Sequence, residues 1–85
     1  MKTAIAKNLK LLRVSAGYTQ KEVAEFIRIE RGAYANYESA DPKRLMPFNL
    51  LLKICDLYGV SMNDLINENN ESNKFVYAFR INSKD

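Results

Sequence analysis

The sequence predicts a mainly α-helical protein, with five short helices followed by one C-terminal β-strand. Apolar residues recur at helical spacing through most of residues 3–67, and glycine, proline and capping residues divide this region into five segments. After a polar, turn-rich stretch, residues 74–81 alternate with a period of two, which is typical of a strand. The expected organisation is therefore a helical domain over residues 1–67, a polar linker over 68–73 and a C-terminal strand segment over 74–85.

The first helix is expected to run from about Thr3 to Ala16. Its buried stripe consists of four apolar residues, namely Ile5, Ala6, Leu9 and Leu12. Gly17 follows at the point where a left-handed backbone conformation often ends a helix, because glycine adopts that conformation without a steric penalty.

Residues 19–38 predict two short helices with a tight joint between them. Thr19 followed three residues later by Glu22 is a capping box, which marks the start of a helix over about 20–27. One face of that helix is apolar and consists of Val23, Ala24 and Ile27. After a break at 28–30, a helix over about 31–38 is expected to turn three residues toward the core or its rim: Ala33, Tyr34 and Tyr37. This arrangement is the pattern of a helix-turn-helix.

The fourth helix is expected to be the central, buried one. Residues 39–46 form a loop, and Pro47 suits the first turn of the helix that follows. That helix is apolar almost all round, through Phe48, Leu50, Leu51, Leu52, Ile54, Cys55, Leu57 and Tyr58. Its narrow polar stripe consists of Asn49, Lys53 and Asp56. Gly59 ends it, and Ser61 with Asp64 caps a fifth helix from Met62 to about Asn67.

The composition argues against an enzyme and against a metalloprotein. Histidine is absent and Cys55 is the single cysteine, so no internal disulfide, no transition-metal site and no cofactor are expected. Cys55 lies in an apolar run and is interpreted as a small buried hydrophobe. The sequence contains no nucleophile elbow and no glycine-rich phosphate loop. It also contains no run of eighteen apolar residues and no signal-peptide pattern, which predicts a cytoplasmic protein without a membrane partner.

The net charge of +3 is unevenly distributed along the chain. Residues 1–53 hold ten basic and five acidic residues, whereas residues 54–85 hold three basic and five acidic residues. The basic half is the half that carries the helix-turn-helix pattern. Such an excess is expected of a surface that meets phosphates, although on its own it also fits an ordinary solvated surface.

The chain resembles the Xre/Cro family of lambda-repressor-like DNA-binding proteins. The matching elements are L-R at 12–13, G-Y-T-Q at 17–20, V-A at 23–24, Y-A-N-Y-E at 34–38 and G-V-S-M-N-D-L at 59–65. The resemblance implies a five-helix DNA-binding domain whose second and third helices read the major groove. It further implies a sequence-specific transcriptional regulator, with repression as the expected mode, that binds a palindromic operator in double-stranded DNA as a homodimer. It identifies no small-molecule effector.

The resemblance also implies which residues contact DNA. Base contacts are expected from Gln20, Arg31, Gly32, Ala35 and Asn36. Phosphate contacts are expected from Thr19, Gln20, Lys21, Lys43 and Arg44. The chemistry supports Arg31 best, because an arginine can bond both acceptors of guanine in the major groove.

Two residues match a salt bridge of the family, and three others depart from the family pattern. Arg13 and Glu38 match residues that form a buried salt bridge between the first helix and the end of the third. Arg28 stands at a turn position where the family usually has glycine, and Glu30 replaces the usual serine or threonine. Gly32 lowers the helix propensity of the third helix by roughly 1 kcal/mol relative to alanine.

The C-terminal segment is expected to form a dimer interface. Four large residues would share one face of the strand: Phe75, Tyr77, Phe79 and Ile81. The sequence offers no second strand-like segment, so this strand is expected to pair with its copy in a second subunit. The alternative is a protein-interaction module, such as an antitoxin or adaptor, in which DNA binding is secondary. On that hypothesis the interface anchors would be found among four tyrosines: Tyr18, Tyr34, Tyr37 and Tyr58.

Overall fold

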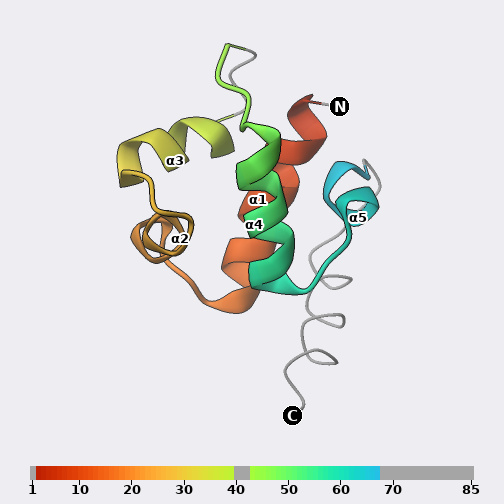
Figure 1. Cartoon of the computed structure of the whole chain (residues 1–85), viewed down its shortest axis with the longest axis horizontal. Coiled ribbons are helices and arrows are strands. Elements are labelled where there is room, and N and C mark those ends of the chain that lie inside the picture. Colours follow the sequence, from red (N-terminus) through yellow and green to blue (C-terminus); the bar gives the residue numbers. More distant parts are fainter. Residues whose placement is uncertain (1, 40–42, 68–85) are drawn as a thin grey trace.

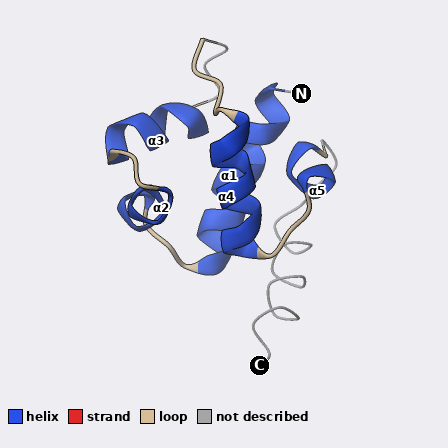
Figure 2. Cartoon of the chain, viewed as in Figure 1, coloured by secondary structure: helices blue, strands red, loops and turns tan. Residues whose placement is uncertain are grey.

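The computed structural model describes residues 2–39 and 43–67 of the 85-residue chain. These residues form five helices and no strand (Figure 2). The helices are α1 (Lys2–Ala16), α2 (Gln20–Ile27), α3 (Arg31–Glu38), α4 (Phe48–Tyr58) and α5 (Met62–Ile66). The predicted linker over 68–73 and the predicted strand over 74–81 lie outside the described residues. Within the described part of the chain, no helix is long and apolar enough to cross a membrane.

The helices pack around a single core, with α2 and α3 on one side of α4 and α5 on the other (Figure 1). α1 contacts both α3 and α5, and α4 contacts both α2 and α5. Every helix contributes residues to the core, and the loop before α4 contributes Met46. The core residues are Leu9, Leu12, Val23, Ala24, Ile27, Tyr34, Met46, Leu50, Leu51, Ile54, Tyr58 and Leu65. The short α2–α3 pair is therefore held by tertiary packing rather than by its own helical stability.

The helix ends follow the predicted capping signals closely. Gly17 and Gly59 both have positive φ angles, of 79° and 66°, as their positions after α1 and α4 predicted. The Ser61 hydroxyl accepts a hydrogen bond from the Asp64 amide, and the Asp64 carboxylate accepts one from the Ser61 amide. α5 ends at Ile66, one residue earlier than expected.

α1 contains one buried polar residue that the sequence analysis overlooked. Ala6, Leu9 and Leu12 are buried as predicted and Ile5 is half-buried, but Asn8 is also completely buried. Its amide nitrogen donates to the Leu65 carbonyl at 2.6 Å and to the Asn67 carbonyl at 2.9 Å. Asn8 thereby fastens the last turn of α5 to α1.

The prediction that α4 is buried nearly all round is wrong on one side. Leu50, Leu51 and Ile54 face the core, but Phe48 is 65% exposed and Leu52 is 46% exposed. No helix in the described part of the chain covers that side, since α2 and α5 flank α4 instead. α4 thus leaves an apolar face open to solvent.

Candidate nucleic-acid interface

α2 begins at the capping box that the sequence predicted. The Glu22 amide donates to the Thr19 hydroxyl at 3.1 Å, and the Thr19 amide donates to the Glu22 carboxylate at 2.8 Å. These reciprocal bonds satisfy two amides that have no partner within the helix. Thr19 and Lys21, two expected phosphate contacts, are both exposed at this helix start.

The turn between α2 and α3 depends on Arg28, which has φ 62° and ψ 48°. This is the left-handed conformation, which a side chain makes less favourable by about 1–2 kcal/mol. The Arg28 amide donates to the Glu25 carbonyl and the Ile29 amide donates to the Ala24 carbonyl, so the end of α2 is closed by hydrogen bonds. Arg28 therefore adopts the conformation for which the family pattern has glycine.

α3 presents its N-terminal residues to solvent. Arg31 and Gly32, two of the expected base contacts, are exposed. Ala33 is also exposed, which contradicts the prediction that it lies in the core or at its rim. Tyr34 is completely buried and Tyr37 is half-buried, and these two rings are wide enough to anchor the helix without a contribution from Ala33.

The outer side of α3 continues into the loop that precedes α4. A shallow cleft of about 170 Å³ is lined by Ala33, Asn36, Tyr37, Lys43, Arg44 and Leu45. Lys43 and Arg44 are exposed, whereas Asn36 and Ala35 are half-buried. The structure therefore brings the two expected phosphate-binding cations beside one of the expected base-contacting residues.

A continuous chain of polar contacts joins α3 to the domain interior. Arg31 donates to the Gln20 side-chain oxygen at 3.1 Å, and the Gln20 side-chain nitrogen donates to Glu38 at 3.3 Å. Glu38 in turn receives two hydrogen bonds from Arg13, at 2.7 and 3.1 Å. Because both ends of the Gln20 amide are engaged, its orientation is set, and Arg31 is held at the start of α3.

Arg13 and Glu38, which the family resemblance paired, form a bidentate ion pair with little access to water. Their side chains are 14% and 5% exposed. The hydrogen bond to Glu38 raises the pKa of Arg13. Burial works to raise the pKa of Glu38, but the hydrogen bonds that it accepts, first among them the one from Arg13, outweigh burial and lower that pKa. Both residues therefore stay charged at neutral pH.

The tyrosines that the alternative hypothesis used as interface anchors lie mostly inside the domain. Tyr34 and Tyr58 are buried, and burial raises the pKa of both phenols. Tyr18 and Tyr37 are half-buried and pack against the core. Tyr34 and Tyr58 are therefore core residues rather than interface anchors, which leaves Tyr18 and Tyr37 as the candidates for that role.

The described residues hold no cluster of metal ligands and one thiol. No group of three or more Cys, Asp or Glu side chains converges within the described part of the chain. Cys55 is half-buried, and burial raises the pKa of its thiol, which disfavours the reactive thiolate.

Comparison with known proteins agrees with this geometry. A model of the helix-turn-helix domain family matches residues 6–71 of the chain. The HTH-type transcriptional regulator ImmR of Bacillus subtilis (strain 168) is 40% identical over 73 residues, which cover 84% of this chain and 54% of that relative. The chain thus spans about half the length of this curated relative. No solved structure gives a significant match. The matched region contains the capped α2, the turn at Arg28 and the exposed start of α3, and the chain belongs to the Xre-like helix-turn-helix family.

Proposed function

We propose that this protein is a sequence-specific transcriptional regulator that represses by placing α3 in the major groove of a palindromic operator. The observation that carries the proposal is the exposed Arg31 at the start of α3, held by Gln20. A helix-turn-helix reads bases with the N-terminal part of its second helix. The printed function of the relative from Bacillus subtilis, a transcriptional regulator, supports the same role.

The proposed base contacts come from the outer side of α3 and the start of α2. Arg31 bonds a guanine, and Asn36 bonds an adenine or a phosphate. Gly32 and Ala35 allow close approach to the base edges or contact a thymine methyl. Gln20 contributes a base or phosphate contact and also orients Arg31, since its amide oxygen accepts from the guanidinium.

The proposed phosphate contacts lie on both sides of the base-reading residues. Thr19, Gln20 and Lys21 are placed at the start of α2, and Lys43 and Arg44 follow α3. Backbone contacts of this kind fix the position of a reading helix on the duplex, and they make the affinity fall as salt is raised. The role is one of binding, and we assign no reaction to it.

The proposal is tested by selecting bound sequences from a random pool of DNA duplexes with the full chain. We expect one preferred sequence with two inverted halves, bound with an affinity that falls steeply as salt rises. A protein-interaction module of the antitoxin or adaptor type, whose DNA binding is secondary, would yield at most weak enrichment. Recovery of no enriched sequence at low salt would therefore contradict the proposal.

Replacing Arg31 by alanine is expected to weaken binding to the selected operator by about 1–3 kcal/mol and to relax the preference at one base position. The reason is that the bidentate contact to guanine is lost while the phosphate contacts remain. The measurement is a titration against the operator and against operators altered at each position. Unchanged affinity and unchanged preference would show that Arg31 does not read a base.

Replacing Lys43 or Arg44 by alanine serves as the matched comparison. Each change is expected to weaken binding to all sequences alike. Each is also expected to reduce the slope of log affinity against log salt concentration by about one, since one phosphate contact is lost. A loss of preference at a single base position would instead place that residue among the base contacts.

We further propose that the homodimer forms through residues 74–81, with Phe75, Tyr77, Phe79 and Ile81 on the shared face of an antiparallel two-stranded ribbon. A strand needs a partner for its backbone groups, and a twofold axis matches a palindromic operator. Removing residues 74–85 is expected to leave a monomer at micromolar concentration, measured as mass in solution by light scattering. A dimer that survives this deletion at undiminished strength would show that the segment is not the principal interface.

A further inference from the structure

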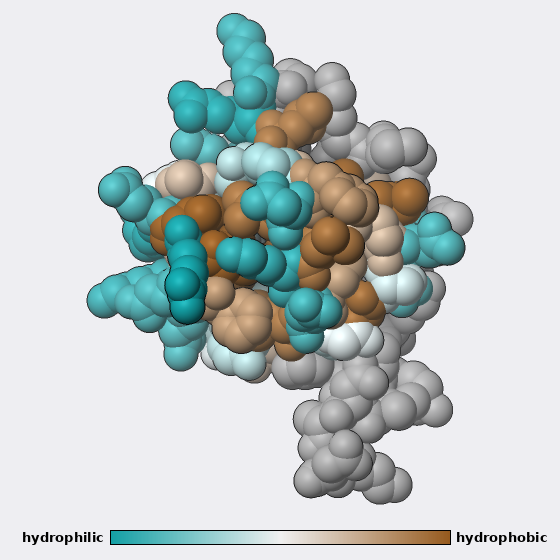
Figure 3. Space-filling view, in the orientation of Figure 1, coloured by the Kyte–Doolittle hydropathy of each residue, from teal (hydrophilic) through white to brown (hydrophobic). Residues whose placement is uncertain are grey.

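Glu30 is an acidic residue at the start of the proposed reading helix. It directly precedes Arg31 and α3, and residues 30–33 are all exposed. Figure 3 shows hydrophilic side chains gathered over the side of the molecule on which α2 and α3 lie. A negative charge at this place repels phosphates, so it lowers the affinity for every DNA sequence. Its presence beside Arg31 therefore calls for a role that offsets this loss.

The fold makes no use of the Glu30 carboxylate. Glu30 occupies the N-cap of α3, where serine, threonine, aspartate and asparagine are favoured because their side chains accept hydrogen bonds from helix amides. The Glu30 side chain accepts no such bond. It also forms no salt bridge within residues 2–39 and 43–67. The carboxylate is thus available to a ligand.

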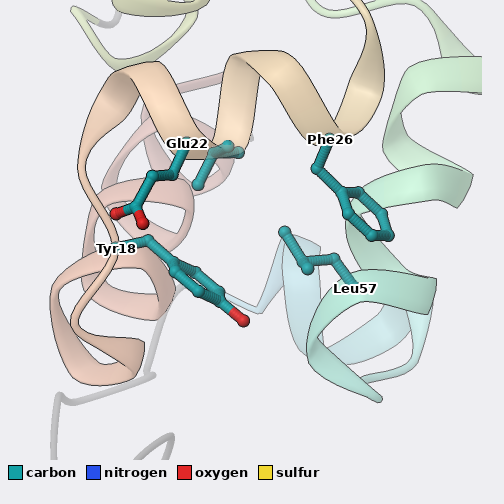
Figure 4. A pocket seen from close by; sticks show the side chains of 5 residues that line it. Tyr18, Glu22, Phe26 and Leu57 are labelled. Carbon is teal, nitrogen blue, oxygen red and sulfur yellow. The ribbon is translucent and has the colours of Figure 1, made fainter.

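The nearby carboxylates on α2 and α3, in contrast, are engaged in the fold. Glu22 accepts a hydrogen bond from the Thr19 amide at 2.8 Å, and in Figure 4 its carboxylate is directed back toward the chain at Tyr18. Glu38 accepts two hydrogen bonds from Arg13. These two acidic residues are explained by the stability of the domain, whereas the one at the N-cap of α3 is not.

Gly32 gives an independent sign that a partner approaches the first turn of α3. A Cβ added at Gly32 would meet no atom within 4 Å, and its φ angle is not positive. Neither packing nor backbone conformation therefore requires glycine, which lowers helix propensity relative to alanine. Glycine is also the residue that permits a close approach of the backbone to a ligand. The missing side chain leaves room for base edges beside Glu30 and Arg31.

We propose that Glu30 is a specificity-determining residue that accepts a hydrogen bond from the N4 amino group of a cytosine. The inference rests on the proposed function, in which Arg31 bonds a guanine. Consecutive Cα atoms are about 3.8 Å apart and successive base pairs rise by about 3.4 Å, so residues 30 and 31 suit neighbouring base pairs. The cytosine is therefore placed in the base pair next to that guanine.

The donors and acceptors of the major groove explain why a cytosine is favoured. A carboxylate can only accept hydrogen bonds. Thymine presents an acceptor at O4, guanine presents acceptors at O6 and N7, and adenine presents a donor at N6 beside an acceptor at N7. Cytosine presents the N4 donor and no acceptor of its own. Glu30 thus weakens binding to all sequences, but least where the cytosine is present, which raises specificity rather than affinity.

Selection of bound duplexes with the full chain and with two variants tests this assignment. The unaltered chain is expected to enrich a cytosine beside the guanine in each half-site. Glu30→Gln is expected to shift that position toward adenine, because a carboxamide can bond N6 and N7 together. Glu30→Ala is expected to lose the preference at that position and to keep the guanine. An unchanged preference in both variants overturns the proposal.

Titrations against altered operators measure the size of the effect. Replacing the cytosine by thymine is expected to weaken binding of the unaltered chain about tenfold. Glu30→Ala is expected to bind the two operators with affinities within about twofold of each other, and to bind unrelated DNA more tightly because one negative charge is removed. A tenfold discrimination that survives in Glu30→Ala contradicts the assignment.

An operator with N4-methylcytosine at this position isolates the single hydrogen bond. The methyl group can take the place of the N4 hydrogen that faces the major groove, while the other hydrogen keeps the pair with guanine. This change is expected to weaken binding of the unaltered chain about tenfold and to leave binding of Glu30→Ala unchanged, which forms a double-mutant cycle across the interface. An equal loss for both proteins overturns the proposal.

Glu25→Gln provides the matched control for charge. Glu25 is an exposed carboxylate on α2, and its replacement removes the same charge as Glu30→Gln does. It is expected to leave every base preference unchanged, and melting curves show that both variants remain folded. If Glu30→Gln and Glu25→Gln change the affinity for all sequences by the same factor, Glu30 acts only by repulsion and the proposal is wrong.

Gly32→Ala tests the close approach of the bases through two effects of opposite sign. The variant is expected to raise the melting temperature, because alanine favours a helix more than glycine does. It is expected at the same time to weaken binding to the operator about tenfold, because the added methyl group holds the base edges away. An undiminished affinity shows that the bases do not approach the first turn of α3 and overturns the proposal.

Failure of this inference can be told apart from failure of the proposed function. An enriched operator whose preferences are the same for the unaltered chain, Glu30→Gln and Glu30→Ala rejects the cytosine contact and keeps the sequence-specific regulator. Recovery of no enriched sequence with the unaltered chain rejects both.

Discussion

Replacing Arg13 by methionine is expected to destabilise the fold by about 3–5 kcal/mol, and replacing Glu38 by glutamine is expected to do the same to a lesser degree. Each change leaves a charge that has little access to water without its partner, since the two side chains are only 14% and 5% exposed. Methionine approximates the aliphatic part of arginine, so the loss reflects the charge rather than a large cavity.

The double variant is expected to be much less unstable than the sum of the two single variants. Their coupling free energy, measured by chemical denaturation, should exceed the ~0.2–1 kcal/mol of an exposed ion pair. Lys10→Met combined with Glu38→Gln provides the control, because Lys10 is an exposed cation on the same helix. Strict additivity of Arg13→Met and Glu38→Gln would mean that the two charges do not stabilise one another.

The same pair predicts a pH dependence with a definite sign. The pKa of Glu38 is lower in the folded protein than in the unfolded chain, so its stabilising contribution is present above the unfolded value of about 4.5. That contribution is lost as the pH falls through the lower, folded value. Glu38→Gln should therefore show a smaller loss of stability between neutral and acid pH than the unaltered chain.

The α2–α3 unit was predictable because its signals are local. Thr19 and Glu22 cap a helix through atoms three residues apart, and the structure begins α2 at Gln20 as that signal requires. The break at 28–30 was predictable for the same reason, although Arg28 reaches the left-handed conformation without being glycine. Helix ends depend on nearest neighbours, and a single sequence contains that information.

The faces of the helices were less predictable because packing decides them. A helix of eight residues such as α3 is too short for its apolar residues to define one buried face. In the structure the large ring of Tyr34 lies in the core, whereas Ala33 is exposed to solvent. Similarly, the apolar character of α4 indicated full burial, but two flanking helices are too few to cover it. The Gln20–Arg31 contact joins residues eleven positions apart on two helices, and no local pattern predicts it.

Asn8 shows most clearly that a local pattern does not reveal which residues are buried. A polar residue in an amphipathic helix is ordinarily assigned to the solvent-exposed side, so no pattern in the sequence indicated that Asn8 is buried. In the structure its amide donates to the carbonyls of Leu65 and Asn67 at the C-terminal end of α5. Carbonyl groups at a helix end receive no hydrogen bond from a following helical turn. These two bonds tie the five-residue helix α5 to α1.

Replacing Asn8 by alanine is expected to destabilise the fold by about 2–4 kcal/mol, because it removes two hydrogen bonds and takes the Asn8 donor from the buried Leu65 carbonyl oxygen. Asn8→Asp should be at least as harmful, since it keeps the shape but loses both donors and buries a charge. Asn63→Ala, at an exposed position of α5, is the matched control and should change stability by less than about 0.5 kcal/mol. Amide hydrogen exchange measures the effect on α5 alone. In Asn8→Ala the amide of Leu65 should exchange faster, whereas the amides of α2 should keep their protection. Retained protection at Leu65, with stability unchanged, would show that α5 is held by its apolar contacts alone and that the Asn8 bonds contribute nothing to its docking.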